Sequence, residues 1–408
     1  MILLAHPFGN ANVRAVLRAF QDAELLAKFI TTVGYSRTAA FLSLLPSGAQ
    51  RRAYDLPPEK IQAYPMRETV RLLAGAAGFE TLTRHERGWA SIDRVWRDLD
   101  ARAARYFRAN KQRQQIGGVY AYEDCALDLF AAAHELGGRR VYDLPIAYYE
   151  TAQRLLQKEA QRYPDWEPTL GGTRDSEEKL ARKRAELELA ELVICPSDFV
   201  LESLPAEARG AKQCVVVPFG SPSAQSSART PRSEAQLRVL FAGALTQRKG
   251  LADLFAAVKL IDSAEVELVV MGSLLQPLRW YRERCPDFTY EPPRSHPEVL
   301  ALMQTCDVFV LPSIVEGRAL VQQEAMASGL PIIATKNAGA DDLIEEGVTG
   351  FVVPIRSPEA IAEKISWCLA HRASISGMGI AAQARAADLT WRGYGESVLA
   401  AIRTLTGK

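Results

Sequence analysis

The stretch LPSIVEGRALVQQEAMASGLPIIAT, residues 311–335, decides the fold. It continues the apolar run DVFVL (307–311), which is typical of a buried strand, and it ends in PIIAT (331–335), which is typical of a second strand. The residues between them predict a helix that begins near Glu316–Gly317 and stops at Gly329–Leu330–Pro331. A strand, a helix and a strand in this order indicate a βαβ unit and a mainly parallel sheet.

This predicted helix carries two glutamates, Glu316 and Glu324, with seven residues between them. On one helix they would be separated by about 12 Å along the axis. The amides from Gly317 to Leu320 would lie beside the first glutamate, and the N-terminus of a helix attracts anions. Both carboxylates could therefore border an elongated groove for a nucleotide-sugar. The alternative is that both are solvated side chains of a surface helix.

A second run, FAGALTQRKG at 241–250, predicts a strand that ends in small residues and a loop before the next helix. Arg248 and Lys249 lie in that loop, and two cations at the carboxyl end of a strand suit a diphosphate. An ordinary basic loop is the alternative. The runs at 269–273 and 288–293 are either walls of a base pocket or ordinary strand ends and loops.

The whole chain repeats the alternation of strands and helices in two series. Its 408 residues predict two or three domains at roughly 150 residues each. A stretch rich in Ser, Ala and Pro, 221–235, is typical of a linker. We therefore expect an α/β fold with two doubly wound, Rossmann-like domains, 1–220 and 236–385, facing a central cleft. A C-terminal helix, 386–408, is expected to pack back on the N-terminal domain. The predicted strands are 2–5, 29–33, 118–122, 140–144, 192–196, 237–241, 266–271, 307–311, 331–335 and 351–353.

Composition and charge exclude several classes of protein. A hydrophobic content of 48% and a charged content of 24% are typical of globular proteins, and a formal net charge of +1 argues against a nucleic-acid partner. The six cysteines form no C-x-x-C pair, so we expect reduced thiols, no metal site and a cytoplasmic protein. The start, MILLAHPFG, predicts a strand rather than a signal peptide, and no run approaches the ~20 apolar residues of a membrane span.

The segment 84–113 is long, charged and helical in period, with nine Arg and Lys against four Asp and Glu. One interpretation is a surface helix that packs one face on a core. The other is that its basic face binds an anionic membrane, at the inner face of which the protein would be peripheral, or the phosphate of an acceptor. The apolar positions that fall on roughly one face are Trp89, Ile92, Trp96, Leu99, Ala103 and Tyr106.

These motifs together resemble glycosyltransferase family 4 (group 1), the retaining enzymes of GT-B type. The resemblance covers about residues 180–355 well, and the remainder loosely. Besides 311–335 and GALTQRKG (243–250), it rests on RKRAELELAELVICPSDFVLESLP (182–205), VVPFG (216–220) and EEGVTGFVVP (345–354).

The resemblance implies a donor held mainly by the C-terminal domain. Glu316 would contact the transferred sugar and act as the catalytic residue, and Glu324 would contact the ribose. Arg248 and Lys249 would neutralise the diphosphate. The other implied donor-binding residues are Gly243, Gly317, Arg318, Ala319 and Leu320. The reaction would be a retaining transfer, without a metal or a cofactor, to a hydroxyl of a glycan, a lipid or a small molecule.

This sequence departs from the family pattern at three places. Ala244 follows Gly243 where the family often has an arginine, and Arg318–Ala319 would add a charge at the sugar end. The run GVYAYEDCA (118–126) offers Glu123 where many members have a histidine.

The loop HPFGNANVR (6–14) resembles the loop that approaches donor and acceptor in these enzymes. It makes Gly9 and Asn10, together with Glu123, candidate acceptor-side residues. His6 is either a base or a satisfied structural group. The other four histidines are interpreted as structural or surface residues.

Two other classes of protein are alternatives for this sequence. A non-catalytic nucleotide-sugar scaffold or sensor would share the fold, but it would not need the leaving-group cations Arg248 and Lys249. An NAD-dependent dehydrogenase is disfavoured, since no G-x-G-x-x-G follows the first strand.

Overall fold

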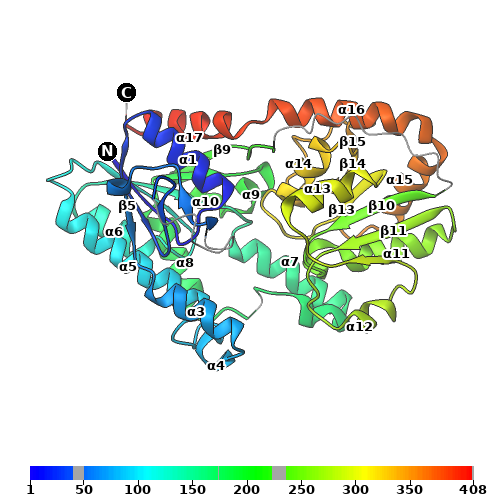
Figure 1. The fold of residues 1–408 in the computed structure, drawn as a ribbon, viewed down its shortest axis with the longest axis horizontal. Helices are drawn as coiled ribbons and strands as arrows, with labels where there is room; N and C mark the ends of the chain where they lie inside the picture. The colour runs from blue at the N-terminus through cyan, green and yellow to red at the C-terminus, as the bar shows by residue number, and fades with distance from the viewer. Residues whose placement is uncertain (40–49, 173, 223–235, 407–408) are drawn as a thin grey trace.

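The computed structural model describes residues 1–39, 50–172, 174–222 and 236–406, which form two α/β units side by side (Figure 1). Each unit is built on a parallel sheet. The predicted linker lies, from residue 223 onward, outside the described residues.

The N-terminal sheet has seven strands in the order β5-β2-β1-β6-β7-β8-β9, and all its pairs are parallel. Most of its strand residues are buried, because helices cover both faces of such a sheet. A separate parallel pair is formed by β3 (Tyr35–Ser36) and β4 (Ala53–Tyr54). The strands of the large sheet are β1 (Ile2–Ala5), β2 (Leu26–Thr31), β5 (Ile61–Ala63), β6 (Gly118–Tyr122), β7 (Arg139–Asp143), β8 (Leu192–Cys195) and β9 (Gln213–Val216).

The C-terminal sheet has six parallel strands in the order β12-β11-β10-β13-β14-β15. In both sheets the chain order reverses beside the first strand, so each unit is doubly wound. Five of these six strands were predicted to within about two residues, the usual uncertainty of such boundaries, and β12 was not predicted. The six strands are β10 (Leu237–Ala242), β11 (Val266–Met271), β12 (Thr289–Glu291), β13 (Val308–Leu311), β14 (Ile332–Thr335) and β15 (Gly350–Val353).

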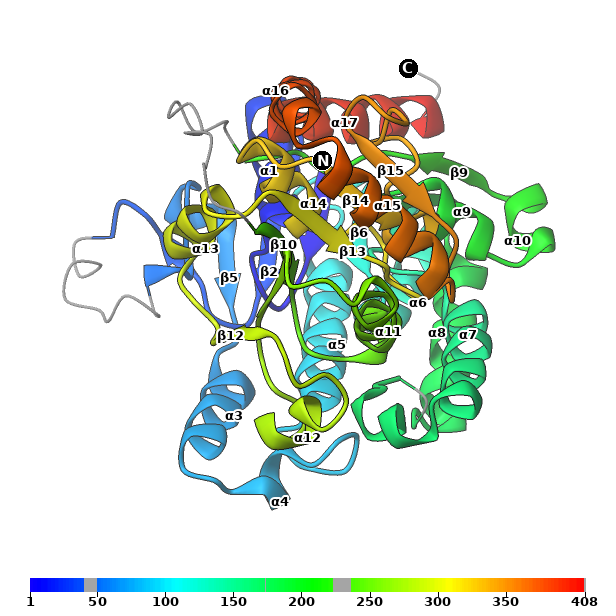
Figure 2. The same ribbon diagram turned by 90° about the vertical axis from the view of Figure 1, so that its right-hand side faces the viewer.

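Helices connect the strands and cover the sheets (Figures 1 and 2). The helices before the linker are α1 (Ala11–Asp22), α3 (Met66–Ala76), α4 (Glu80–Thr83), α5 (Ile92–Asn110), α6 (Leu127–Glu135), α7 (Tyr149–Arg162), α8 (Glu177–Leu189), α9 (Asp198–Ser203) and α10 (Ala206–Ala211). Those after it are α11 (Leu251–Ile261), α12 (Leu278–Arg282), α13 (His296–Gln304), α14 (Leu320–Ala327), α15 (Pro358–Ala370), α16 (Arg372–Asp388) and α17 (Trp391–Thr406).

The last helix crosses back to the N-terminal unit, where Figure 1 shows α17 beside α1. The two helices pack closely at Gly395, since a Cβ there would lie 2.8 Å from the Cβ of Ala19 and 2.9 Å from the carbonyl oxygen of Ala15. Tyr394 is buried, and its hydroxyl donates to Asp143 at 3.3 Å.

A second segment crosses in the opposite direction, from the N-terminal unit to the C-terminal unit. The 3-10 helix η3 (Pro164–Thr169) follows α7, and its Trp166 is buried in the C-terminal core, with ring centroids 5.9 Å from Phe255 and 4.8 Å from Trp280. The predicted N-terminal domain, 1–220, therefore includes a segment whose side chains complete the core of the other unit.

The predicted long helix at 84–113 is shorter than expected. It begins at Ile92, because the hydroxyl of Ser91 accepts a hydrogen bond from the amide of Arg94 and caps the helix there. Leu99 and Ala103 are buried as expected, whereas Trp89 lies outside the helix and is exposed.

Within the described ranges, no helix combines the length and apolar character needed to cross a bilayer. All six cysteines lie in those ranges, none of them is in a disulfide, and all but the half-buried Cys214 are buried.

Candidate functional site

The candidate site lies where strand order reverses in the C-terminal sheet. β10 and β13 are neighbours there, and the loops that follow them lead to opposite sides of the sheet. Such a point leaves a crevice at the carboxyl ends of the strands, where ligands of open α/β sheets bind. The loop after β10 carries Arg248 and Lys249, and the loop after β13 carries Glu316.

The structure brings these three predicted side chains together. Oε1 of Glu316 lies 2.5 Å from Nζ of Lys249 and 2.9 Å from Nη1 of Arg248. Burial alone would raise the pKa of Glu316, but the two cations outweigh it and hold that pKa below its usual value. Burial also lowers the pKa of Lys249, with Glu316 opposing the shift and Arg248 adding to it.

Local backbone geometry sets the position of both cations. The hydroxyl of Thr246 accepts from the amide of Arg248 at 3.1 Å and caps the short turn η4 (Gln247–Lys249). Gly250 ends the turn at φ +74°, so close to β13 that a Cβ would lie 2.0 Å from the carbonyl oxygen of Pro312. At Gly243 a Cβ would lie 2.8 Å from Cδ of Lys249, so this glycine leaves room for the lysine side chain.

The predicted start of the helix was wrong. α14 begins at Leu320, so Glu316 lies in the preceding loop, and the predicted separation of the two glutamates along one helix does not apply. The amide of Ala319 donates to the carbonyl oxygen of Ala338 at 3.2 Å and is therefore not free for a phosphate. Leu320 packs against the core of the N-terminal unit.

Contacts with the N-terminal unit explain this shift. Gly317 lies so close to the loop after β7 that a Cβ would be 1.8 Å from the carbonyl oxygen of Pro145. The hydroxyl of Ser197 donates to the carbonyl oxygen of Gly317 at 2.7 Å. The amide of Ala147 donates to the carbonyl oxygen of Glu316 at 3.3 Å. The loop that carries Glu316 is thus held from the other unit, and this overrides the local preference for helix.

Arg318, which was predicted to add a charge at the sugar end, is paired in the structure. Its side chain is completely buried, and Nη1 lies 2.6 Å from Oδ1 of Asp342 and 3.4 Å from the carbonyl oxygen of Pro196. Nε donates to Oε1 of Gln323 at 3.2 Å. A buried guanidinium needs such partners, and here they link the two units.

The prediction missed the residues that hold the loop of Arg248 and Lys249. The hydroxyl of Thr246 donates to the carbonyl oxygen of Thr169 at 2.6 Å. Nε2 of Gln247 donates to Glu159 at 2.7 Å and to Asp253 at 2.8 Å, and all three side chains are fully buried. Glu159 also pairs with Arg356. Nothing in the sequence of α7 marked Glu159, because a glutamate in a charged helix is usually solvated.

Glu324 lies on α14 apart from the charged cluster. Its Oε1 is 3.4 Å from Nδ1 of His296, the first residue of α13. Burial raises the pKa of Glu324, and His296 opposes that shift. This histidine, interpreted from the sequence as structural or surface, is thus the neighbour of a predicted donor-binding carboxylate.

The acceptor-side candidates lie at the reversal point of the N-terminal sheet, after β1 and β6. Gly9 packs against Tyr54, since a Cβ would lie 2.3 Å from that ring. Asn10 is exposed at the start of α1. Oε2 of Glu123 pairs with Nζ of Lys183 at 3.2 Å, while its buried Oε1 has no hydrogen-bond partner among the described residues.

His6 is buried and packs edge-on against Tyr122, with ring centroids 4.6 Å apart. Burial lowers the pKa of His6 to about 3, opposed by its hydrogen bond to the backbone of Phe8, so the ring is neutral near neutral pH. The structural interpretation of His6 is therefore favoured.

One group of potential metal ligands lies in the described part of the chain, at His85, Glu86 and Asp175. The ammonium of Lys179 lies 3.1 Å from the carboxylate of Asp175, so a cation of the protein already neutralises this group. None of the three belongs to the charged cluster of Glu316.

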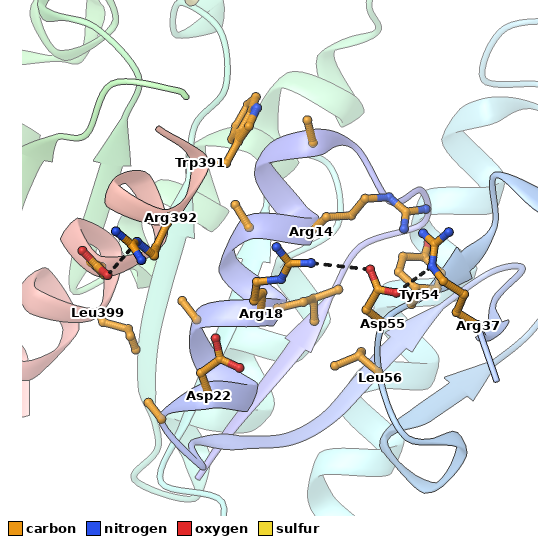
Figure 3. A pocket seen from close by; sticks show the side chains of 16 residues that line it. Arg14, Arg18, Asp22, Arg37, Tyr54, Asp55, Leu56, Trp391, Arg392 and Leu399 are labelled. Atoms are coloured by element: carbon orange, nitrogen blue, oxygen red, sulfur yellow. Dashed lines mark hydrogen bonds and ion pairs between the residues drawn. The ribbon is translucent and has the colours of Figure 1, made fainter. Parts of the chain in front are cut away.

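A cavity of about 570 Å³ lies elsewhere, between α1, α17 and the residues around β4 (Figure 3). Arg14, Arg18 and Arg37 surround Asp55 on one side of it, and Trp391 and Leu399 line the other. It includes none of the predicted donor- or acceptor-binding residues, so we do not assign it to the candidate site.

Residues 236–371 match the family model described as Glycosyl transferases group 1. A similar curated protein is the D-inositol 3-phosphate glycosyltransferase of Arthrobacter sp. (strain FB24), 31% identical over 40% of this chain and 43% of its own length. Another is the putative colanic acid biosynthesis glycosyltransferase WcaL of Salmonella typhimurium, 30% identical over 32% of this chain and 35% of its own. The chain thus spans less than half the length of these relatives.

Solved structures match the whole chain. Sucrose-phosphate synthase from Thermosynechococcus elongatus superposes with a TM-score of 0.68 at 18% identity, covering 100% of this chain and 99% of its own. Anabaena HepE, in complex with UDP and glucose, gives 0.60 at 17%, also covering 100% and 99%. The predicted GT-B fold is confirmed, and so is the predicted group 1 resemblance for residues 236–371.

Proposed function

We propose that the protein transfers a sugar from a nucleotide-diphosphate donor to a hydroxyl acceptor. The match of residues 236–371 to the group 1 glycosyltransferase model supports this proposal. One observation carries the proposal. A buried carboxylate and two cations, Glu316 with Lys249 and Arg248, meet at the point of the sheet where a ligand can enter. The structure of HepE in complex with UDP and glucose is consistent with it.

In the proposed donor complex the diphosphate takes the place of Glu316 as the partner of Lys249 and Arg248. Its two phosphates carry more charge than one carboxylate, and charge-assisted hydrogen bonds to them are strong. The carboxylate of Glu316 is then free to accept hydrogen bonds from the hydroxyls of the transferred sugar. These ion pairs thus hold both sets of groups ready for the donor.

We propose that transfer retains the configuration of the sugar. The bond between the anomeric carbon and the phosphate oxygen breaks, and its electron pair stays with the diphosphate. The acceptor oxygen bonds to the anomeric carbon from the same face, and its proton passes to the departing phosphate oxygen. Lys249 and Arg248 stabilise the charge that develops there, a task that preorganised cations perform well in a site that excludes water.

The same two cations are the basis for proposing a reaction without a metal or a cofactor, since they supply the charge that a divalent ion would bring to the leaving group. Glu324 is proposed to accept hydrogen bonds from the ribose hydroxyls, with His296 beside it. Asn10 and Glu123 are proposed to face an acceptor that is a glycan, a lipid or a small molecule. The reaction is proposed to take place in the cytoplasm.

A donor assay tests the proposal. Thermal shifts with UDP, GDP, ADP and their sugars select the donor, and transfer or slow donor hydrolysis is then followed by NMR. The anomeric coupling of the product reports the configuration, and the assay is repeated with a chelator. Donor binding without any hydrolysis or transfer would favour the scaffold or sensor instead. An inverted product or loss of activity with the chelator would contradict the mechanism.

A further inference from the structure

The helical hairpin at residues 66–92, which comprises α3, α4 and the approach to α5, exposes an unusual amount of apolar surface. Seven large apolar side chains in it are between 37% and 65% exposed. Clustered patches of this kind mark interaction surfaces, whereas single exposed apolar residues are ordinary. The seven are Met66, Leu72, Leu73, Phe79, Leu82, Trp89 and Ile92.

The packing of α3 explains why these side chains face outward. Of its eleven residues only Glu68 and Ala74 are buried. Glu68 pairs with Arg71 of the same helix at 2.7 Å and with Arg52 at 3.1 Å, so an ion pair to Arg52, rather than a broad apolar face, attaches this helix to the protein. A helix this short gains its stability from covering its apolar face, and this face has no cover within the described residues.

Figures 1 and 2 show α3 and α4 extending beyond the rest of the N-terminal unit. The hairpin follows β5, whose carboxyl end lies at the same edge of the parallel sheet as the ends of β1 and β6. That edge carries Asn10 and Glu123. A flat partner could therefore contact the hairpin without a clash with the body of the protein, and it would then lie near the acceptor side of the cleft.

Charge around the hairpin favours one kind of partner. Arg84, Arg87 and Arg94 are exposed at its base, against the single exposed carboxylate of Glu80. The guanidinium of Arg67 lies 4.4 Å from the ring centre of Trp89 and 3.6 Å from the carboxylate of Asp98, so its charge is already paired. Exposed apolar side chains beside arginines and an aromatic ring are typical of segments that lie in the interface of anionic bilayers.

We propose that the hairpin 66–92 binds the surface of an anionic phospholipid bilayer, with Leu72, Leu73 and Phe79 inserted below the headgroups. The proposed membrane contact thus lies mostly N-terminal to α5, the basic helix that the sequence suggested for this role. Two arginines further along α5 already have partners, since Arg102 pairs with Asp98 at 2.8 Å and Arg108 with Glu135 at 2.9 Å. The proposal does not rest on the proposed function, because it needs neither donor nor acceptor.

Co-sedimentation with vesicles tests it on the full chain. Vesicles of three parts phosphatidylcholine to one part phosphatidylglycerol should bind the protein, and pure phosphatidylcholine should bind it much less. The double variant Leu73→Glu with Phe79→Glu should weaken binding at least about tenfold, because each change puts a charge into the apolar layer. Both positions are exposed, so the fold should survive, as its melting temperature will show.

The matched control is Leu260→Glu with Ile380→Glu, which changes two side chains of the C-terminal unit that are 58% and 68% exposed. It should bind anionic vesicles as the unmodified protein does. Arg84→Gln and Arg87→Gln should each weaken this binding about fivefold, and added salt should do the same.

Equal binding by the hairpin variant and its control would overturn the proposal. So would the absence of binding to anionic vesicles. A dimer in solution that the hairpin variant converts to a monomer, without vesicle binding, would instead show that the surface pairs two copies of the chain.

Discussion

Nε2 of Gln247 lies 2.7 Å from Oε2 of Glu159, and this hydrogen bond ties the loop of Arg248 and Lys249 to a helix of the N-terminal half. The loop of Glu316 is held from the same half, where Pro145 and Ala147 contact it. Residues 145–169 thus form one continuous stretch that touches both charged loops. The relative position of the three charged groups therefore depends on a segment that contributes none of them.

Gln247→Leu tests this dependence. The change leaves the buried carboxylates of Glu159 and Asp253 each without one donor, and we expect it to cost roughly 2–4 kcal/mol of unfolding free energy. Because the loop loses its anchor, UDP affinity should also fall about tenfold at a temperature where the variant is fully folded, a loss of about 1.4 kcal/mol. Isothermal titration measures the affinity. Undiminished affinity in a destabilised protein would show that the anchor matters for stability alone.

The strand pattern predicted the central strands of both sheets because buried parallel strands are continuous apolar runs, such as LRVLFA in β10 and VELVVM in β11. The edge strands β5, β9 and β12 were not predicted. The sequence also placed Glu316, Arg248 and Lys249 in one donor site at the carboxyl ends of the strands, but it did not predict that they pair with one another. These predictions needed only local pattern and the topology that it implies.

The features that the sequence did not predict depend on contacts between the two units. No local signal placed Gly317 against Pro145, and that contact delays the helix to Leu320. The sequence favours burial of Trp166, but it does not indicate which of the two cores contains this side chain. Arg318 was predicted to be a site cation, and only the structure shows that Asp342 and the carbonyl oxygen of Pro196 are its partners.

Glu316→Gln should abolish transfer without loss of nucleotide binding. The amide cannot hold sugar hydroxyls as a carboxylate does, so we expect transfer to fall at least about a hundredfold. UDP should bind no more weakly than before, because the carboxylate that competes with the diphosphate for Lys249 and Arg248 is gone. Parallel rate and titration measurements check both parts. Retained transfer would remove Glu316 from the sugar end.

Lys249→Ala should weaken the hold on the diphosphate. We expect about a tenfold loss of UDP affinity and about a hundredfold loss of turnover, since the departing charge loses a preorganised cation. The pH dependence has a definite sign. Because burial lowers the pKa of Lys249, the unmodified protein should lose UDP affinity as the pH rises toward that lowered value, below the usual range for lysine. The alanine variant should not show this loss, and identical profiles would contradict the assignment.

Gly317→Ala tests the contact between the units. The new Cβ would lie 1.8 Å from a backbone oxygen that cannot move aside, so the loop of Glu316 must shift or the units must separate. We expect turnover to fall at least about tenfold, because displacements of about 1 Å are costly in catalysis. Gly377→Ala is the matched control, since a Cβ there meets nothing within 4 Å. Equal activity of the two variants would show that the contact is not needed in the working enzyme.

Asp143 provides a pH-dependent test of the contact between α17 and the N-terminal unit. Its Oδ2 accepts from the hydroxyls of Tyr120 at 2.6 Å and of Tyr394 at 3.3 Å. Burial raises the pKa of Asp143 to about 7, against the opposing effect of these hydrogen bonds. Between the unfolded value of 3.8 and about 7, the folded protein holds a proton that the unfolded chain releases, so stability falls as the pH rises through this window.

Asp143→Asn removes that proton equilibrium and keeps the shape of the side chain. The free energy of unfolding of the variant, relative to the unmodified protein, should therefore increase by roughly 2–3 kcal/mol between about pH 5 and pH 8. Taking the difference between the two proteins cancels the titration of other buried groups, such as Glu186. Urea unfolding at several pH values measures it. A difference that stays constant with pH would mean that Asp143 is already ionised in the folded protein at pH 5.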